Sequence, residues 1–340
     1  MTRQSRRRLF WLSVGLFLLI APPIIFYTTG WRLTSDFKVK RTGGLFVAVS
    51  EAESDVYLEG KFEKKTNFFQ SGVFVQNLTP GPYSVLVSKD GFWPWAKVVQ
   101  VSESGVAETK AMTLSQNIGG KVLLSGPFES VYASGSDKIL LLEEKKGQKY
   151  NLTFYDPDKN EFLSPANSSS KTLISNSDKI KAIIWRTAGA EVFFEKKVLS
   201  LDFNFTNRSV AAKSSQSALD DTLPALPQKI SSDRKQNARA WYLDRQVWVE
   251  WLSDSPMPFY LSGSKEMVFE TKDEVRGAAF MPKRDDVLMV AIENGVFAIE
   301  IDGRSRRNLQ PLYKGKSPTF AVLEKIIYIL DNGTLSKLDF

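Results

Sequence analysis

The sequence contains no histidine and no cysteine among its 340 residues. Without imidazole or thiol groups it cannot form Ser-His-Asp or Cys-His nucleophilic sites, zinc sites built on these ligands, or disulfides. Extracellular eukaryotic domains commonly carry disulfides, so the absence of cysteine favours a bacterial origin. Only paired carboxylates remain for general acid–base catalysis, and we expect no enzymatic activity, no cofactor and no metal.

Acidic residues are nearly missing from the N-terminal region, where Asp36 is the only one among the first 50 residues. The formal net charge is +7, and the sequence places four of the positive charges at Arg3, Arg6, Arg7 and Arg8. Much of the basic excess is therefore a signal for membrane topology. No recognition-helix pattern or basic-aromatic stripe is present, so nucleic-acid binding is not predicted.

One long apolar segment without a charge is present: residues 9–27, 19 residues in all. At ~1.5 Å per residue such a helix covers about the ~30 Å hydrocarbon core of a bilayer. Aromatic residues stand near both ends, at Trp11, Phe26, Tyr27 and Trp31. We therefore predict a basic cytoplasmic tail over residues 1–8, a single-pass anchor in the cell membrane over residues 9–31, and an extracytoplasmic remainder.

Two alternatives to an anchor are a cleaved signal peptide and a buried helix of a soluble protein. A soluble core helix would show a polar stripe, whereas between residues 9 and 26 Ser13 is the only polar side chain. A cleavage site requires small residues, and Ala21 is followed by Pro22 and Pro23. The sequence favours an uncleaved anchor, with the two prolines kinking or loosening its outer part.

Residues 43–114 contain short alternating apolar runs separated by turn residues, which predicts a small antiparallel β unit. The expected strands are Leu45–Val49, Val56–Leu58, Val73–Val75, Tyr83–Val87, Lys97–Val101 and Glu108–Leu114. Turn residues such as Pro80-Gly81 and Asp90-Gly91 separate them.

This segment resembles a PEGA domain. The resemblance rests on Leu78-x-Pro80-Gly81-x-Tyr83, continued by Lys89-x-Gly91-Phe92, and on the strands before and after it. The sequence departs from the family at the turn 50–55, where a Pro-Glu-Gly-Ala-like stretch is usual, and at residues 66–67, where a Thr-Pro is usual. The resemblance implies a small β-sandwich of microbial surface proteins, generally non-enzymatic, that acts in envelope interactions.

Phe92, Trp93 and Trp95 flank a proline in a predicted loop of this module. Exposed aromatic rings on a β module can stack on a sugar or a Pro-rich strand, which makes these residues candidate ligand-binding residues. The alternative is that the rings close one end of the sandwich or pack on the next domain.

Residues 118–340 contain a recurring sequence pattern of an apolar run, a turn and a second strand. This recurrence resembles that of a WD40-like or TolB-like β-propeller. The last two strong copies are about 42 residues apart, the length of a propeller blade. We predict about five blades, with insertions near Asn167 and Gln216, and with residues 121–124 supplying the fourth strand of the last blade. An irregular β-sandwich or a stacked pair of sheets is the alternative. Strong copies begin at Ala182, Ala278 and Thr319, and weaker ones at Val131 and Ala238, the latter including Phe259–Leu261.

The stretch 211–237 is rich in Ser, Lys and Gln and is predicted to be an exposed loop. Among the carboxylates, Glu250 stands out because Trp248 and Trp251 flank it. Asp156, Asp158, Asn160 and Glu161 have spacing similar to a calcium loop, although Gly at the sixth position and Glu at the twelfth are missing. The other interpretation of Glu250 is an ordinary residue on the outward face of a strand. The other interpretation of residues 156–161 is a β-turn with solvated acids.

The sequence thus predicts an all-β ectodomain behind one transmembrane helix. The predicted function is a membrane-anchored binding or scaffold protein that contacts envelope glycan or protein. The alternative function is a carboxylate-dependent envelope glycoside hydrolase, which would require two carboxyl groups facing each other across a cleft.

Overall fold

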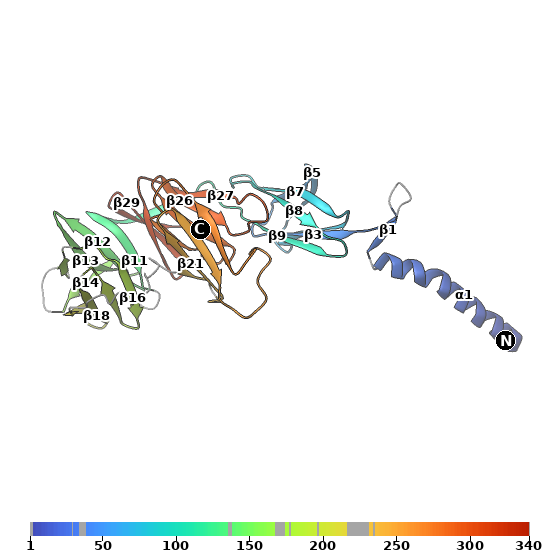
Figure 1. Ribbon diagram of the computed structural model, residues 1–340, viewed down its shortest axis with the longest axis horizontal. Helices are drawn as coiled ribbons and strands as arrows, with labels where there is room; N and C mark the ends of the chain where they lie inside the picture. The colour runs from blue at the N-terminus through green and yellow to red at the C-terminus, as the bar shows by residue number, and fades with distance from the viewer. Residues whose placement is uncertain are drawn as a thin grey trace. The chain divides into compact units, whose positions relative to one another are not determined.

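The computed structural model describes residues 3–28, 30–33, 39–134, 138–166, 174–176, 178–195, 197–215, 231–233 and 235–339. The chain divides into two compact units. The first comprises residues 1–113 with 304–306, and the second comprises residues 114–303 with 307–340. Figure 1 shows one helix near the N-terminus and strands through the rest of the described chain.

Helix α1 spans Arg3–Thr28 and runs through both Pro22 and Pro23. It is long and apolar enough to cross a membrane. The Ser13 hydroxyl donates to the Leu9 carbonyl at 2.9 Å, so this polar group is satisfied within the helix. The helix ends at Thr28, and the predicted anchor boundary at Trp31 stays a prediction. Gly30, with φ 85°, follows the helix, and its N–H donates to the Tyr27 carbonyl at 3.2 Å. A glycine in the left-handed region ends a helix without steric cost.

The helix leads into the first β unit through a short, hydrogen-bonded junction. Strands β1 (Trp31–Leu33) and β2 (Val39–Arg41) pair antiparallel. The Gly30 carbonyl accepts the Thr42 N–H at 2.8 Å, and the Thr42 carbonyl accepts the Ser104 N–H at 3.0 Å. Within the first unit, the chain after α1 is therefore bonded directly to the β structure that follows.

The first unit contains a module of two sheets, which we call the N-terminal β module (residues 43–113). One sheet has the order β6-β3-β9 and the other β5-β4-β7-β8. The strands are β3 (Gly43–Val49), β4 (Asp55–Leu58), β5 (Lys61–Lys65), β6 (Gly72–Leu78), β7 (Gly81–Ser88), β8 (Trp95–Val101) and β9 (Val106–Ala111).

Apolar residues alternate with exposed ones along these strands, most regularly in β8, so that each sheet buries one face. The predicted strands are present, but two details of the prediction are wrong. The unit is not wholly antiparallel, because β3 and β9 pair in parallel. The sequence reading also missed β5, whose five residues are all exposed at the sheet edge and carry no apolar alternation.

The second unit, the C-terminal β unit, consists of antiparallel meanders. Three sheets have four strands each, in the orders β10-β30-β29-β28, β20-β21-β22-β23 and β24-β25-β26-β27, and a nine-stranded sheet contains the rest. The strands are β10 (Gly120–Ser125), β11 (Phe128–Ala133), β12 (Leu140–Lys146), β13 (Lys149–Asp156), β14 (Glu161–Pro165), β15 (Ile174–Asn176), β16 (Ala182–Arg186), β17 (Gly189–Phe193), β18 (Val198–Asn204), β19 (Ser209–Ser215), β20 (Ser231–Ser232), β21 (Ala238–Leu243), β22 (Gln246–Trp251), β23 (Lys265–Glu270), β24 (Gly277–Phe280), β25 (Val287–Ile292), β26 (Gly295–Glu300), β27 (Leu309–Lys314), β28 (Thr319–Leu323), β29 (Ile326–Asp331) and β30 (Thr334–Leu338).

Successive four-stranded meanders are the building plan of a β-propeller. The predicted completion of the last sheet by an early strand is confirmed, because β10 pairs antiparallel with β30. One feature departs from separate blades: β14 and β19 pair in parallel and join two meanders into the nine-stranded sheet. Buried apolar clusters lie between neighbouring sheets, for example Leu140 and Tyr155 of one against Tyr328 and Leu330 of another.

One strand prediction and one loop prediction in this unit are wrong. Phe259–Leu261 lies in a turn, and the strand that pairs with β22 is β23. The predicted loop 211–237 contains the end of β19 and the short β20, because backbone pairing with β18 and β21 outweighs the polar composition. The stretch 216–230, with the predicted insertion at Gln216, lies outside the described residues, as does Asn167.

Candidate functional site

A cleft of about 600 Å³ opens in the C-terminal β unit, and we call it the cationic cleft. Segments from three sheets meet at its walls: the start of β11, the ends of β10, β12 and β29, and the residues just before β16, β24 and β28. The residues that line it are Gly126, Pro127, Phe128, Glu129, Ser130, Lys145, Lys179, Arg276, Lys316, Ser317, Leu330, Asn332 and Gly333.

Four cations and one acid line this cleft. The Glu129 carboxylate lies 3.7 Å from the Lys145 ammonium and 3.4 Å from the Lys179 ammonium. The Nε atom of Arg276 is buried and has no hydrogen-bond partner among the described residues. The cleft therefore carries a positive charge that its own acid does not balance.

Backbone hydrogen bonds fix the segments that carry these cations. The N–H of Lys145 donates to Pro127 O at 3.1 Å, and that of Arg276 to Ala291 O at 2.8 Å. The Lys316 N–H lies 3.1 Å from both Asp331 carboxylate oxygens. These bonds hold the main chain of the cleft walls in one arrangement before any ligand arrives.

Glu143 lies buried beside the cleft and fixes the segment that carries Lys179. Its carboxylate accepts the Ile180 N–H at 3.0 Å. Burial raises the pKa of the Glu143 carboxyl above its ordinary value, while the Ile180 N–H, Lys179 and the Ser130 hydroxyl oppose that increase.

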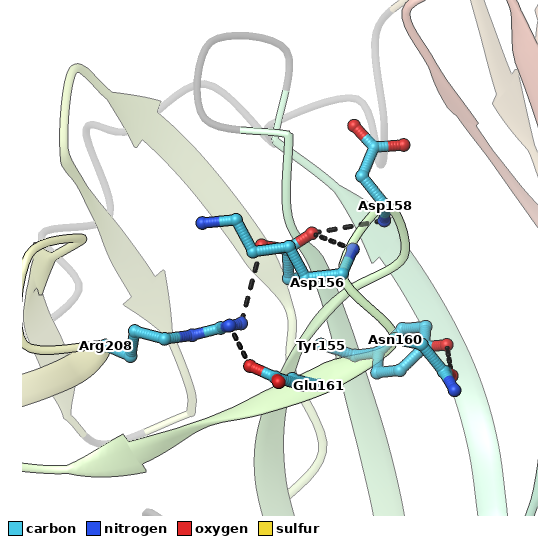
Figure 2. A network of polar contacts seen from close by, with 7 residues as sticks. Tyr155, Asp156, Asp158, Asn160, Glu161 and Arg208 are labelled. Carbon is cyan, nitrogen blue, oxygen red and sulfur yellow. Dashed lines mark hydrogen bonds and ion pairs between the residues drawn. The ribbon is translucent and has the colours of Figure 1, made fainter.

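A second charged cluster, the Arg208 cluster, lies at the turn between β13 and β14 (Figure 2). The Arg208 guanidinium bonds to the Glu161 carboxylate and lies 3.5 Å from Asp156 Oδ2. Asp156 Oδ1 accepts the N–H groups of Asp158 and Lys159, both at 3.1 Å. These contacts describe a hydrogen-bonded β-turn within one meander, whose acids pair with Arg208 of the neighbouring meander. Among the described residues, no group of three or more Asp and Glu could hold a metal ion.

The aromatic residues predicted at the 92–95 loop are not arranged as one exposed surface. Trp95 is the first residue of β8 and is fully buried, which contradicts its predicted place in a loop and leaves its ring no exposed face. Phe92 and Trp93 are half-buried, and the Lys89 ammonium lies 4.4 Å from the Phe92 ring centroid. For Trp95 the structure favours packing inside the module, because its ring belongs to the core between the sheets.

Two exposed aromatic residues near this loop were missed in the sequence. Phe68 is 88% exposed and Phe69 is 95% exposed, and their rings meet edge to face at 5.6 Å. Asp55 of β4 pairs with both Lys65 and Ser88. The turn after Lys65 and the turn after Ser88 therefore begin at the same end of the sheet. We call residues 66–71 with 89–94 the aromatic end of the module. In the sequence, the two adjacent phenylalanines after Asn67 were the signal that could have predicted this exposed aromatic surface.

Glu250 is engaged within its sheet. It pairs across β21 and β22 with Arg239, whose Nε lies 2.7 Å from Glu250 Oε2. Next to it, Trp241 and Trp248 stack at 6.5 Å, with the Lys265 ammonium 5.2 Å from the Trp241 centroid. This cross-strand ladder explains the aromatic neighbours of Glu250 as sheet packing.

The topogenic arginines lie in the first turns of α1, so the predicted tail 1–8 is helical from Arg3 onward. The side chains of Arg6, Arg7 and Arg8 are exposed. They lie at the N-terminal end of the apolar segment, and their topogenic role stays a prediction.

No family model and no curated protein matches this sequence. Among solved structures, regucalcin, a calcium-binding protein from Agrobacterium tumefaciens, is 10% identical, with 66% of this chain and 94% of that chain covered and a TM-score of 0.37. The Cps50 (Swd1) β-propeller domain of Myceliophteria thermophila is 9% identical, with 76% and 92% covered and a TM-score of 0.32. Hydrazine synthase of Kuenenia stuttgartiensis is 14% identical, with 64% and 76% covered and a TM-score of 0.32. Because these TM-scores are all below 0.5, we conclude nothing about this chain from the three structures. The assignment of a propeller-type fold rests on the strand pairing.

Proposed function

We propose that this chain is a membrane-tethered binding protein of a bacterial cell envelope, without catalytic activity. The observation that carries the proposal is the junction after α1. An apolar helix of membrane-spanning length ends at Thr28, and Gly30 is hydrogen-bonded to Thr42 and through it to Ser104 of the β module. A helix joined in this way would present the β module directly at a bilayer surface.

The charge distribution supports a cytoplasmic N-terminus. Exposed Arg6, Arg7 and Arg8 precede the apolar stretch, and positively charged flanks are retained on the cytoplasmic side. Residues 9–27 would then contact lipid, and both β units would lie outside the membrane. Trp31 stacks on Phe26 at 5.5 Å, which provides the aromatic pair expected at the outer interface.

The resemblance to a PEGA domain supports a role in envelope contacts, with the aromatic end as the contact surface. In this proposal Phe92, Trp93, Phe68 and Phe69 together contact the partner. Trp95 is buried and stabilises the core of the module. The partner is envelope glycan or envelope protein. The competing function, a glycoside hydrolase using Glu250, receives no support from geometry, because Arg239 occupies that carboxylate.

Topology can be tested with single cysteines, because the natural chain has none. Ser5→Cys and Lys213→Cys variants of the full chain would be exposed in intact cells to a membrane-impermeant maleimide. We expect Lys213→Cys to react in intact cells and Ser5→Cys to react only after permeabilisation. Reaction of both before permeabilisation, or of neither, contradicts the tether.

Binding can be tested by retention of envelope components on the full chain in detergent micelles. Glycan and protein pools would be offered separately to the natural protein, to a Phe68→Ser, Phe69→Ser variant and to Trp93→Ala. We expect each change to reduce retention severalfold, whereas Leu243→Ser, at an equally apolar residue 64% exposed in the other unit, leaves it unchanged. Shortened glycan in the incubation would overturn the non-catalytic proposal.

A further inference from the structure

The cationic cleft has the composition of an anion site. Among the described residues, Lys145, Lys179, Arg276 and Lys316 line it, and Glu129 is the one acid. Glu129 forms ion pairs with the lysine side chains of Lys145 and Lys179, which are 49% and 60% exposed. Such solvent-exposed pairs are weak and exchange readily with an incoming anion.

Arg276 provides the second observation. Its Nε is buried and meets no acceptor among the described residues, although a guanidinium can only donate hydrogen bonds. A buried donor without an acceptor is unfavourable. Arg276 also lines the cleft, so a rotation of its side chain that turns Nε toward an oxyanion there would satisfy this donor. The planar fork of arginine suits the paired oxygens of a phosphate or a carboxylate.

The size and rigidity of the cleft fit a small group better than a broad protein surface. Its volume of about 600 Å³ falls within the range of small-molecule sites, about 300–1,000 Å³. The backbone bonds at Lys145, Arg276 and Lys316 fix the segments that carry the cations. Binding would therefore order few main-chain groups.

We propose that the cationic cleft binds an oxyanion, a phosphate or a carboxylate, carried by a polymer of the cell envelope. Arg276 would hold two oxygens at the buried side, and the three lysines would neutralise charge at the rim. Glu129 keeps Lys145 and Lys179 paired until the ligand replaces it. The inference rests on the proposed function only for the source of the ligand, since the site itself is defined by the C-terminal β unit.

Fluorescence anisotropy with the full chain in nonionic detergent tests this site. The labelled probes are a decaphosphate, an oligogalacturonate of about ten residues and a neutral dextran of the same length. We expect at least one charged probe to bind, with affinity falling as salt increases, and dextran not to bind. The two charged probes distinguish phosphate from carboxylate as the preferred group.

Variants locate the binding. Arg276→Gln should lower affinity at least about tenfold, the effect of losing a charge-assisted hydrogen bond. Lys316→Gln, at an exposed residue whose change leaves folding intact, should lower it about threefold. Lys213→Gln and Lys272→Gln remove the same charge from exposed residues outside the cleft and should change affinity less than about twofold.

The site is wrong if neither charged probe binds, or if the control lysines weaken binding as much as Lys316→Gln does. These outcomes are independent of the topology and retention tests. A protein that is tethered and retains envelope material through the aromatic end, yet binds neither charged probe, would sustain the proposed function and refute the cleft.

Discussion

The Arg208 cluster and the cationic cleft belong to the same β unit but balance charge in opposite ways. In the first, one guanidinium serves the carboxylates of Asp156 and Glu161, and nearby N–H groups occupy the remaining oxygen of Asp156. In the second, four cations face one acid, and a buried donor of Arg276 is unused.

The difference separates a structural cluster from a binding site. A group of charges whose hydrogen bonds are satisfied internally gains little from a ligand, whereas unbalanced charge beside a buried donor gains a partner when an anion binds. Arg208 lies next to the parallel pair of β14 and β19, and its substitution should lower the free energy of unfolding. The cleft cations should affect binding with little effect on stability.

The largest effect on stability is expected where the wall of the cleft is changed. Gly333 has φ 73°, and a Cβ there would collide with the Gly126 carbonyl oxygen. Gly333→Ala should destabilise the C-terminal β unit by about 3 kcal/mol or more, because backbone cannot move aside cheaply. Chemical denaturation followed by tryptophan fluorescence measures this.

Gly147→Ala is the matched control, since Gly147 has φ 63° and open space around its Cβ position. Only the left-handed conformation is then penalised, at about 1 kcal/mol. Equal destabilisation by the two changes would show that the close approach of Gly126 and Gly333 does not constrain the cleft wall.

A smaller effect is expected at the Arg208 cluster. Arg208→Ala leaves Asp156 and Glu161 without their shared cation, and because these groups are partly exposed the cost should be about 1 kcal/mol. Arg245→Ala, at an exposed arginine, should cost less than about 0.5 kcal/mol. Binding of the decaphosphate or oligogalacturonate should not change in either variant, and a loss of binding in Arg208→Ala would break the distinction between the two clusters.

A still smaller effect on stability is expected from the cleft lysines. Lys316→Gln should change the free energy of unfolding by less than about 0.5 kcal/mol, because the side chain is exposed and its removal relieves repulsion among like charges. The same denaturation curves measure it. A stability loss comparable to that of Arg208→Ala would mean that Lys316 is structural.

The smallest effect concerns pH. Since burial raises the pKa of Glu143 in the folded state, its contribution to stability is fully present below the ordinary carboxyl range and is lost as pH rises through the folded-state pKa. Glu143→Gln removes this dependence and keeps an acceptor for Ile180. The stability of the variant relative to the natural protein should therefore increase from acid to neutral pH. A parallel pair of stability curves from pH 4 to pH 7 would contradict the raised pKa.

Local patterns carried most of the strand prediction, because alternation of apolar residues marks strands that bury one face. Edge strand β5 has no such pattern, and the parallel pairs β3–β9 and β14–β19 depend on contacts between residues far apart in sequence. Trp95 illustrates the same limit: next to a proline it looks like a loop residue, yet the register with Val87 buries it.

The cleft could not be predicted for a related reason. Its cations come from positions as distant as Lys145 and Lys316, each of which reads in isolation as an ordinary solvated charge. Part of the Arg208 cluster could be predicted, because the alternating oxygen-bearing side chains from Asp156 to Glu161 indicated a turn. The cation that neutralises them lies on a later hairpin.

The most direct test of the central claim is lysine acylation of the full chain, read residue by residue by mass spectrometry, with and without saturating decaphosphate or oligogalacturonate. The difference between the clusters predicts severalfold protection of Lys145, Lys179 and Lys316, with Lys159 of the Arg208 cluster unchanged. Equal protection of all four lysines, or no protection of the cleft lysines by either oligomer, would contradict the assignment of the cationic cleft as the binding site.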